Sequence, residues 1–266
     1  MNIEIKTVKV DDMEMDYFRF GTIGKPAVIV LPGLSLKAVM LNAGAIARQY
    51  DILSKDFDVY VLERRTNVTP GYTIVDMAED SYKVARAIGI ERANVLGVSQ
   101  GGMIAQALGI KHPEFLISLV LTSTISAVDA GNQVLFDKWI EQAKERKTQE
   151  LLEDFARYVY TEEYCQKNAK AIKTMARFVT EEELDRFVIF ASALSGLDLT
   201  DSIRDIKCKT LVVASMKDKI FDYKKALQLA GMLIAESTIY PGYSHALYDE
   251  CPDYLNRLYK FLIENN

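Results

Sequence analysis

The segment 97–101 has residue types that could carry out nucleophilic chemistry. It has the pattern Gly-x-Ser-x-Gly around Ser99, follows an apolar run over residues 93–98 and opens a helical pattern. A serine in a sharp strand-to-helix turn projects its hydroxyl above the sheet, and small residues two positions away avoid a collision. Gly97 and Gly101 meet that need, so the segment predicts a nucleophile elbow. The alternative is that Ser99 only caps the helix; the strand–turn–helix order favours the elbow.

A serine nucleophile needs a base, usually a histidine, and this chain has only His112 and His245. His245 lies in a loop after a short strand pattern at 237–240. Loops beyond the carboxyl ends of strands carry the ligand and catalytic groups of open α/β sheets. His112 precedes Pro113 at the end of a helical pattern, where a structural role beside the helix dipole is expected. We therefore predict His245 as the base; a histidine that merely sits in a surface loop is the alternative.

The acid that orients the base is expected between the serine and the histidine in chain order. Asp218 follows the strand pattern 210–214 after a short turn. Asp222 stands at the start of the next helical pattern, where a capping role would be ordinary. Asp218 is the predicted acid and Asp222 is the alternative.

Two backbone N–H groups must also face the negative charge that develops on the substrate carbonyl. One is expected from Gln100, directly after the nucleophile. The other is expected from Leu34, in the loop after the strand pattern 27–31, where Gly33 allows close approach of the backbone. Pro32-Gly33 alone is equally typical of an ordinary turn.

Short apolar runs recur along the chain and predict the strands that hold these residues. Continuous runs rich in β-branched residues are typical of strands buried on both faces of a parallel sheet. The predicted strands of this kind are residues 27–31, 59–62, 93–98, 116–121 and 210–214, with a shorter strand at 237–240. In the first twenty residues apolar and polar side chains alternate on both sides of Asp11 and Asp12, which predicts an antiparallel hairpin.

Helical patterns lie between the predicted strands, which indicates right-handed crossovers and a doubly wound, mostly parallel α/β sheet. The predicted core helices are residues 77–88, 100–110, 223–235 and 253–263. We expect Asp76 to cap the first of them and Gly89 to end it in the left-handed conformation.

Residues 126–199 break the alternation because they contain no convincing strand pattern. Four helices are predicted there, at 130–146, 148–160, 162–177 and 181–195, and Thr180 with Glu183 forms a capping box for the last one. We expect an all-helical cap over an α/β core made of residues 1–125 and 200–266. The aromatic residues of the cap should mostly pack between cap and sheet, and the remainder could line a pocket; they are Phe136, Trp139, Phe155, Tyr158, Tyr164, Phe178, Phe187 and Phe190.

Composition excludes several classes of protein. The 266 residues are 49% apolar and 26% charged, which is ordinary for a globular protein and not for a disordered or fibrous one. The net charge of −5 argues against a nucleic-acid partner, because phosphate contacts need a basic patch. The three cysteines are widely spaced and predict free thiols in a reducing compartment, and two histidines give no support for a metal site.

The start of the chain shows no apolar signal segment, and its longest apolar stretch, 187–197, falls well short of the about 20 residues that a membrane span needs. A cytoplasmic protein that acts on a small molecule is expected, without a membrane span. The sequence does not indicate an oligomeric state.

Taken together, these features resemble the α/β-hydrolase superfamily, and in particular its capped, single-domain, esterase-type members. The resemblance covers nearly the whole chain, from the hairpin and the Pro-Gly loop through the block 76–102 to the strand before Asp218 and the Gly-Tyr-Ser-His-Ala block around His245. It implies an α/β-hydrolase fold with Ser99 as nucleophile, His245 as base and Asp218 as acid, in agreement with the assignments made from the residues.

Two segments depart from the usual pattern of that superfamily. The oxyanion loop reads Pro32-Gly33 where relatives often have His-Gly, and residues 63–71 replace the Asp-x-Arg-Gly-x-Gly-x-Ser turn that often follows the fourth strand. That turn edges the pocket in relatives, so the commonest subfamilies give no guide to the substrate. Ser99 stands where dehalogenases and epoxide hydrolases of this fold carry an aspartate, which argues against those two activities.

The expected reaction is acyl transfer, with no metal or organic cofactor. The leading expectation is a serine hydrolase of small or medium carboxylic esters. The same triad also serves hydrolysis of carbon–carbon bonds, lactones and thioesters and cofactor-free perhydrolysis, and some members of the fold bind small molecules as receptors. The sequence keeps these alternatives open.

Overall fold

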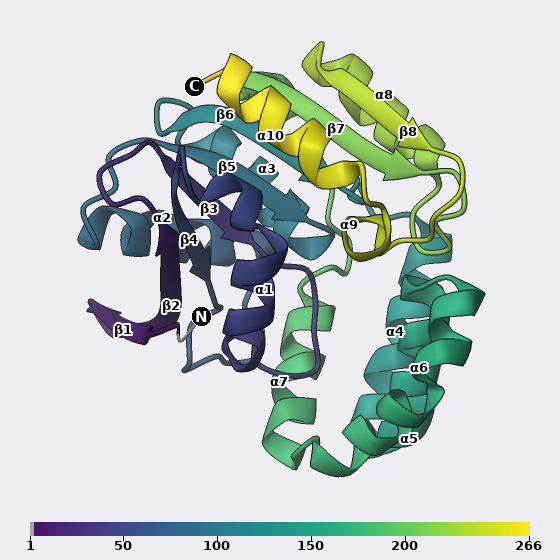
Figure 1. The fold of residues 1–266 in the computed structure, drawn as a ribbon. Helices are drawn as coiled ribbons and strands as arrows, with labels where there is room; N and C mark the ends of the chain where they lie inside the picture. Colours follow the sequence, from purple (N-terminus) through teal and green to yellow (C-terminus); the bar gives the residue numbers. More distant parts are fainter. Residues whose placement is uncertain (1–2) are drawn as a thin grey trace.

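The fold is built on a mixed β-sheet. The computed structural model describes residues 3–266, so the first two residues of the predicted segment 1–125 lie outside the described residues. Eight strands form one sheet in the order β1-β2-β4-β3-β5-β6-β7-β8 (Figure 1). The strands are β1 Ile5–Val10, β2 Met13–Gly21, β3 Ala27–Leu31, β4 Asp58–Leu62, β5 Ala93–Val98, β6 Leu116–Thr122, β7 Lys209–Ser215 and β8 Glu236–Tyr240.

The predicted strands and the predicted sheet type are confirmed. β1 and β2 form an antiparallel hairpin whose turn contains Asp11 in the left-handed conformation, with φ of 54°. β2 also pairs antiparallel with β4, and every later pair is parallel. β3 lies between β4 and β5, so the chain changes direction across the sheet at this point, and the loops after β3 and β5 leave on the two sides of one crevice.

Helices cover both faces of the sheet (Figure 1). α2, α3 and α8 pack with one apolar cluster, whereas α1 and α10 pack with a second cluster on the other face. The core helices are α1 Ala43–Gln49, α2 Ile74–Ala87, α3 Gln100–Lys111, α8 Tyr223–Leu233, α9 Leu247–Glu250 and α10 Tyr254–Glu264. Short 3₁₀ turns lie at Val39–Asn42, Asp51–Leu53, Ala176–Phe178 and Ile203–Asp205.

Several helix ends differ from the prediction; the helices predicted at 130–146 and 181–195 end at residues 144 and 192, and two further ends have a clear local cause. Thr73, not Asp76, is the N-cap of α2; Asp76 lies three residues further on and its carboxylate accepts the Thr73 N–H, completing a capping box. α8 ends two residues before the predicted 235, because Ile234 adopts the left-handed conformation with φ of 51°. Gly89 does end the α2 segment as predicted, with φ of 87°.

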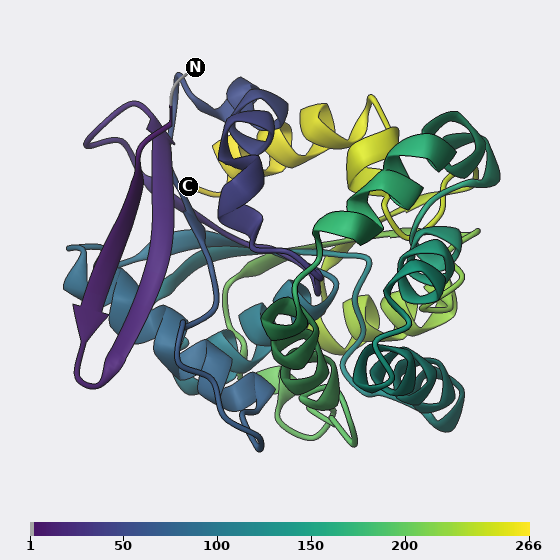
Figure 2. The same ribbon diagram turned by 90° about the horizontal axis from the view of Figure 1, so that it is seen from below.

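Between β6 and β7 the chain forms a helical insertion, here defined as residues 126–199. Its helices are α4 Ala130–Lys144, α5 Thr148–Val159, α6 Glu162–Met175 and α7 Glu181–Ser192. Its two ends meet: Ala127 and Asp198 form an isolated β-bridge, and the Leu199 N–H donates to the Ser126 carbonyl at 2.9 Å. The predicted capping box of Thr180 and Glu183 is present at α7. The carboxyl ends of the parallel strands point toward this insertion (Figures 1 and 2).

Candidate active site

Ser99 occupies a strained turn between β5 and α3. Its φ is 53° and its ψ is −119°, a region that residues other than glycine rarely adopt. The surrounding chain holds it there, since the Ser99 N–H donates to the Thr122 carbonyl at 2.9 Å and the Thr124 hydroxyl donates to the Ser99 carbonyl at 2.9 Å. The elbow predicted around Ser99 therefore has a backbone that its neighbours fix.

The glycines of the elbow are required by close backbone contacts. A Cβ on Gly97 would lie 2.5 Å from the Gly101 carbonyl oxygen, and a Cβ on Gly101 would lie 1.9 Å from the Leu31 carbonyl oxygen. Real Cβ atoms do not approach backbone oxygens so closely, so neither position accepts a side chain without movement of the turn. Sequence reasoning missed Gly102, whose Cβ would meet the Thr124 side chain at 2.6 Å.

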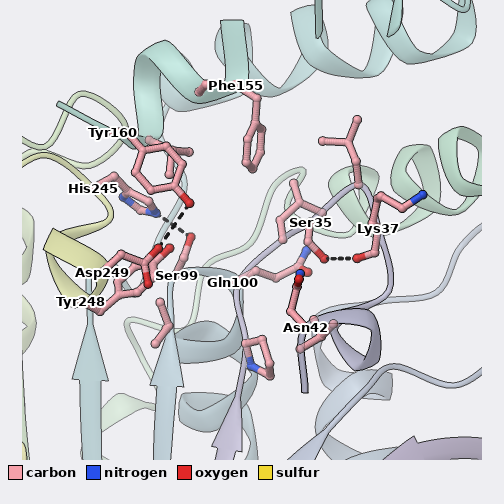
Figure 3. Close-up of a pocket in the computed structure, with 18 of the residues that line it drawn as sticks. Ser35, Lys37, Asn42, Ser99, Gln100, Phe155, Tyr160, His245, Tyr248 and Asp249 are labelled. Carbon is pink, nitrogen blue, oxygen red and sulfur yellow. Dashed lines mark hydrogen bonds between the residues drawn. The ribbon is translucent and has the colours of Figure 1, made fainter. Parts of the chain in front are cut away.

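The structure brings Ser99, His245 and Asp218 together. Nε2 of His245 lies 2.9 Å from Oγ of Ser99, and Nδ1 of His245 lies 2.8 Å from Oδ2 of Asp218. Figure 3 shows the imidazole directed at the serine hydroxyl. An ionised carboxylate can only accept, so Nδ1 carries the proton that it donates to Asp218, and Nε2 is left to accept the hydroxyl proton of Ser99.

The two partners of Ser99 are buried and fixed by further contacts. The side chains of His245 and Asp218 are only 3% and 1% exposed. Oδ1 of Asp218 accepts the N–H groups of Ile220 at 2.8 Å and Phe221 at 3.0 Å, which leaves Oδ2 directed at the histidine. The ring of Phe221 meets the imidazole edge-on, with 5.3 Å between ring centroids.

The loop that carries His245 is held from two sides. The Ser123 hydroxyl, at the end of β6, donates to the His245 carbonyl at 2.7 Å. The Ala246 N–H donates to the Val159 carbonyl, at the end of α5, at 2.8 Å. Neither contact has a signal in the local sequence, because both join segments that are distant along the chain.

The alternatives for base and acid lie elsewhere. Asp222 caps α8, where its carboxylate accepts the Lys224 N–H at 3.0 Å. His112 ends α3, with Nε2 3.1 Å from the Glu79 carboxylate and its ring stacked on Tyr82 at 3.6 Å between centroids. Neither residue lines the cavity that contains Ser99.

The loop after β3 packs directly against the elbow. A Cβ on Gly33 would lie 3.2 Å from Cβ of Ser99. Leu34 and Gln100 line the same cavity as Ser99. Gln100 is the first residue of α3, so its N–H has no acceptor within the helix.

Arg64, which the sequence patterns did not single out, binds the loop after β3 through its side chain. The buried Nη2 of Arg64 donates to the carbonyl oxygens of Pro32 at 2.6 Å and Gly33 at 3.3 Å, and to Oε1 of Gln100 at 3.1 Å. Burial lowers the pKa of this guanidinium, against an opposing effect of the Glu63 carboxylate. Nε2 of Gln100 donates in turn to the Phe190 carbonyl of α7 at 2.6 Å. Gln100, the residue after Ser99, is thus tied both to the loop after β3 and to the insertion.

A cavity of about 580 Å³ opens above Ser99, between the core and the helical insertion. It is lined mainly by apolar side chains, and Figure 3 shows Phe155 pointing into it from the insertion. Of the aromatic residues named from the sequence, those that line it are Phe136, Trp139, Phe155 and Tyr164. Phe178 is 67% exposed in a 3₁₀ turn after α6, so it neither packs between the insertion and the sheet nor lines this cavity.

Within residues 3–266 no three His, Cys, Asp or Glu side chains are grouped so that they could hold a metal ion. No helix in the same part of the chain is both long enough and apolar enough to cross a bilayer.

The sequence of this chain matches a known protein family and several named relatives. Residues 26–252 match the sequence model of the family described as alpha/beta hydrolase fold. A protein named "Putative carbamate hydrolase RutD" from Rhizobium rhizogenes (strain K84) is 24% identical over 245 residues, which cover 85% of this chain and 92% of that protein.

Solved structures share the fold. The alpha/beta hydrolase enzyme MGS-M2, from a Medee basin deep-sea metagenome library, superposes with a TM-score of 0.87 at 19% identity, covering 98% of each chain. The enol-lactonase from Burkholderia xenovorans LB400 superposes with a TM-score of 0.84 at 20% identity, covering 97% of this chain and all of that one. The predicted fold class is confirmed.

Proposed function

The chain belongs to the alpha/beta hydrolase family, and from that premise we propose that it is a serine hydrolase that cleaves small or medium carboxylic esters through an acyl-enzyme. The observation that carries the proposal is the hydrogen-bonded line from Oγ of Ser99 through His245 to Asp218, at 2.9 and 2.8 Å, below a cavity large enough for a small substrate. Ser99 is the nucleophile, His245 the general base and acid, and Asp218 the group that fixes the imidazole.

The geometry supports each step of acyl transfer. Nε2 of His245 takes the hydroxyl proton as Oγ of Ser99 attacks the ester carbonyl, and the new imidazolium is stabilised by the ionised Asp218. His245 then gives the proton to the alcohol that leaves. A water molecule, deprotonated by the same nitrogen, attacks the acyl-enzyme and releases the acid and the free serine. No step needs a further reactant.

The oxyanion is stabilised by the N–H groups of Gln100 and Leu34 in this proposal. The Gln100 N–H is free at the start of α3 and sits beside the nucleophile. The carbonyl of Gly33 accepts from Arg64, and the C=O and N–H of one trans peptide point in opposite directions. The N–H of Leu34 belongs to that peptide, so it is directed away from Arg64. Two preorganised donors of this kind stabilise a tetrahedral oxyanion strongly.

The helical insertion, residues 126–199, acts as a cap domain on a core of residues 1–125 and 200–266. Support comes from its closed base, where Ala127 and Asp198 pair, and from its contribution to the cavity wall above Ser99. An apolar wall of this kind excludes water and selects acyl or alcohol groups by shape.

A carbamate is the second candidate substrate. The observation that favours it is the name of the relatives from Rhizobium rhizogenes and other bacteria, which match more than three-quarters of this chain. A carbamate carbonyl is attacked by the same serine, with a nitrogen-bearing acyl group in place of a carbon-bearing one. The two substrates are distinguished by comparing kcat/KM for an ester and a carbamate of the same alcohol.

The proposal is tested with a fluorophosphonate probe and a panel of p-nitrophenyl esters. We expect a covalent adduct on Ser99 by mass spectrometry, ester turnover by the wild-type chain, and neither for Ser99→Ala. A folded wild-type chain that forms no adduct and hydrolyses no ester contradicts the proposal. Ligand-induced thermal stabilisation without turnover favours a small-molecule receptor on the same fold.

A further inference from the structure

The active-site cavity contains one carboxylate whose charge is not balanced by the protein. Besides His245, the acidic and basic side chains that line the cavity among the described residues are those of Lys37 and Asp249. Nζ of Lys37 lies 3.0 Å from the carboxylate of Glu183 and donates to the Phe178 carbonyl at 2.6 Å. Its positive charge is therefore already paired.

Within the part of the chain that the structure describes, the side-chain partners of Asp249 are neutral groups. Its Oδ1 accepts the side-chain amide of Gln49 at 2.9 Å, and its Oδ2 accepts the hydroxyl of Tyr160 at 3.3 Å. Among residues 3–266 no lysine, arginine or histidine nitrogen lies within 4.0 Å of this carboxylate in the structure. The neighbouring Glu250 adds a like charge, and burial is the main cause that raises the pKa of Asp249. A cation at this point would pair with a carboxylate that lines the cavity and has no cationic partner within residues 3–266.

Aromatic rings surround the same end of the cavity. Tyr160 and Tyr164 stack with 4.1 Å between their centroids, and Tyr248 lines the cavity next to Asp249. Figure 3 shows the Tyr160 hydroxyl directed at Asp249 and the Tyr248 ring beside it. Aromatic faces attract organic cations, and a carboxylate with several such rings is a favourable environment for an ammonium group.

We infer that Asp249, together with the Tyr160, Tyr164 and Tyr248 rings, binds a positively charged ammonium group of the substrate, so that the enzyme prefers cationic esters or carbamates. This inference rests on the proposed function of the Ser99 site, because it concerns the substrate of that same cavity. A substrate carboxylate would meet the Asp249 charge with no free cation to offset it, so anionic esters are disfavoured for the same reason.

The test compares two esters that differ in charge and not in shape. Butyrylcholine carries a quaternary ammonium group, and 3,3-dimethylbutyl butyrate carries carbon in its place. We expect the wild-type chain to have the higher kcat/KM for butyrylcholine, and Asp249→Asn to lower the ratio of the two values about tenfold. Because both rates come from one preparation, partial unfolding of the variant cancels in the ratio.

Glu250→Gln is the matched control. Glu250 is the next residue of α9 and carries the same charge, but it does not line the cavity, and its carboxylate instead accepts the Thr161 N–H at 3.2 Å. In Glu250→Gln we expect the ratio of kcat/KM for butyrylcholine to kcat/KM for the uncharged ester to stay within twofold of the wild-type ratio. An unchanged ratio in Asp249→Asn, an equal loss in Glu250→Gln, or a wild-type preference for the uncharged ester overturns the inference.

Failure of the proposed hydrolase function and failure of the proposed cation recognition give different experimental results. A wild-type chain that hydrolyses neither ester and forms no fluorophosphonate adduct contradicts the hydrolase assignment, whereas the charge preference is still measured by calorimetric binding of butyrylcholine. Binding that weakens about tenfold in Asp249→Asn supports cation recognition, and binding that does not change overturns it.

Discussion

The helices α3 and α6 border the same cavity and are built in opposite ways. In α3 every residue from 100 to 109 is buried, and the elbow before it is fixed by glycine contacts with neighbouring backbone. In α6 no residue is buried, although the helix supplies Tyr164, Ile172 and Met175 to the cavity wall. The floor of the cavity is thus made of tightly packed backbone, and part of its roof is an exposed helix.

This difference separates chemistry from recognition. The groups proposed for acyl transfer need positions fixed within a fraction of an ångström, which dense packing and buried hydrogen bonds provide. Within the insertion, α6 has no buried residue, and the start of this helix meets the core through polar contacts such as Tyr160 with Asp249 and Thr161 with Glu250. Segments with few buried contacts open at lower free-energy cost. We expect changes in the floor to abolish activity and changes in the roof to alter selectivity.

The largest loss of activity is expected from Asp218→Asn. The asparagine carbonyl can still accept the Ile220 and Phe221 N–H groups, but its amide then faces Nδ1 and favours the wrong tautomer of His245. We expect kcat for a p-nitrophenyl ester to fall about 10⁴-fold with little change in melting temperature. Asp222→Asn, at the cap of α8, should leave kcat within about twofold. Equal losses in the two variants would contradict the role given to Asp218.

The second-largest effect is expected from Gly101→Ala, on the stability of the fold. Its Cβ would lie 1.9 Å from the Leu31 carbonyl, so the elbow must move, at a cost of about 3 kcal/mol or more in the free energy of unfolding. Chemical denaturation measures this cost. The control is Gly231→Ala in α8, where a Cβ meets nothing within 4 Å; it should stabilise the chain by about 0.5–1 kcal/mol. If Gly101→Ala left the free energy of unfolding unchanged, the tight packing of the elbow against the Leu31 carbonyl would be contradicted.

Arg64→Ala tests the support of the oxyanion loop. The change removes the donor to the Pro32 and Gly33 carbonyls and to the Gln100 side chain. We expect kcat to fall about 10–100-fold, because the loop after β3 would then stabilise the transition state less well. The change in KM should be smaller, because the cavity that binds the substrate remains. A rise in KM with kcat unchanged would place Arg64 in substrate binding instead.

The smallest effect concerns Asp249 and the pH dependence of stability. Burial raises the pKa of Asp249 in the folded chain above its unfolded value, so the folded state binds the proton more tightly and this contribution is lost as pH rises through the folded pKa. The wild-type chain should therefore lose stability relative to Asp249→Asn as the pH rises from about 4, the ordinary aspartate value, through the raised pKa of the folded chain. Thermal unfolding across this range checks the sign. A difference that is constant or that grows in favour of the wild type with rising pH contradicts it.

Much of the floor could be predicted from the sequence, because its signals are local. A run of β-branched residues, a Gly-x-Ser-x-Gly turn and a following helical pattern lie next to one another in the chain and place Ser99. The order of Asp218 and His245 after it, each behind a strand, limits the candidates for acid and base. The Asp76 cap was predicted wrongly by three residues, because Thr73 and Asp76 are both good capping residues and the first turn of the helix decides between them.

The long-range contacts around the cavity could not be predicted in this way. The helices of the insertion follow from their periodicity, but nothing in residues 63–65 marks Arg64 as a buried donor to Pro32, and nothing around Asp249 marks it as part of a cavity wall. The partners of both residues lie on other elements, which only the packing of the sheet, its loops and the insertion brings close.

The sequence by itself determined the order of strands and helices, the elbow around Ser99 and a short set of candidates for its partners, because these follow from local periodicity and local steric limits. Only the tertiary structure decided that Asp218 and not Asp222 faces His245, that Arg64 binds the loop after β3, and that Asp249 lines the cavity without a cationic partner among residues 3–266. Such pairings depend on distances between segments far apart in the chain, which the packing of the sheet and the insertion sets.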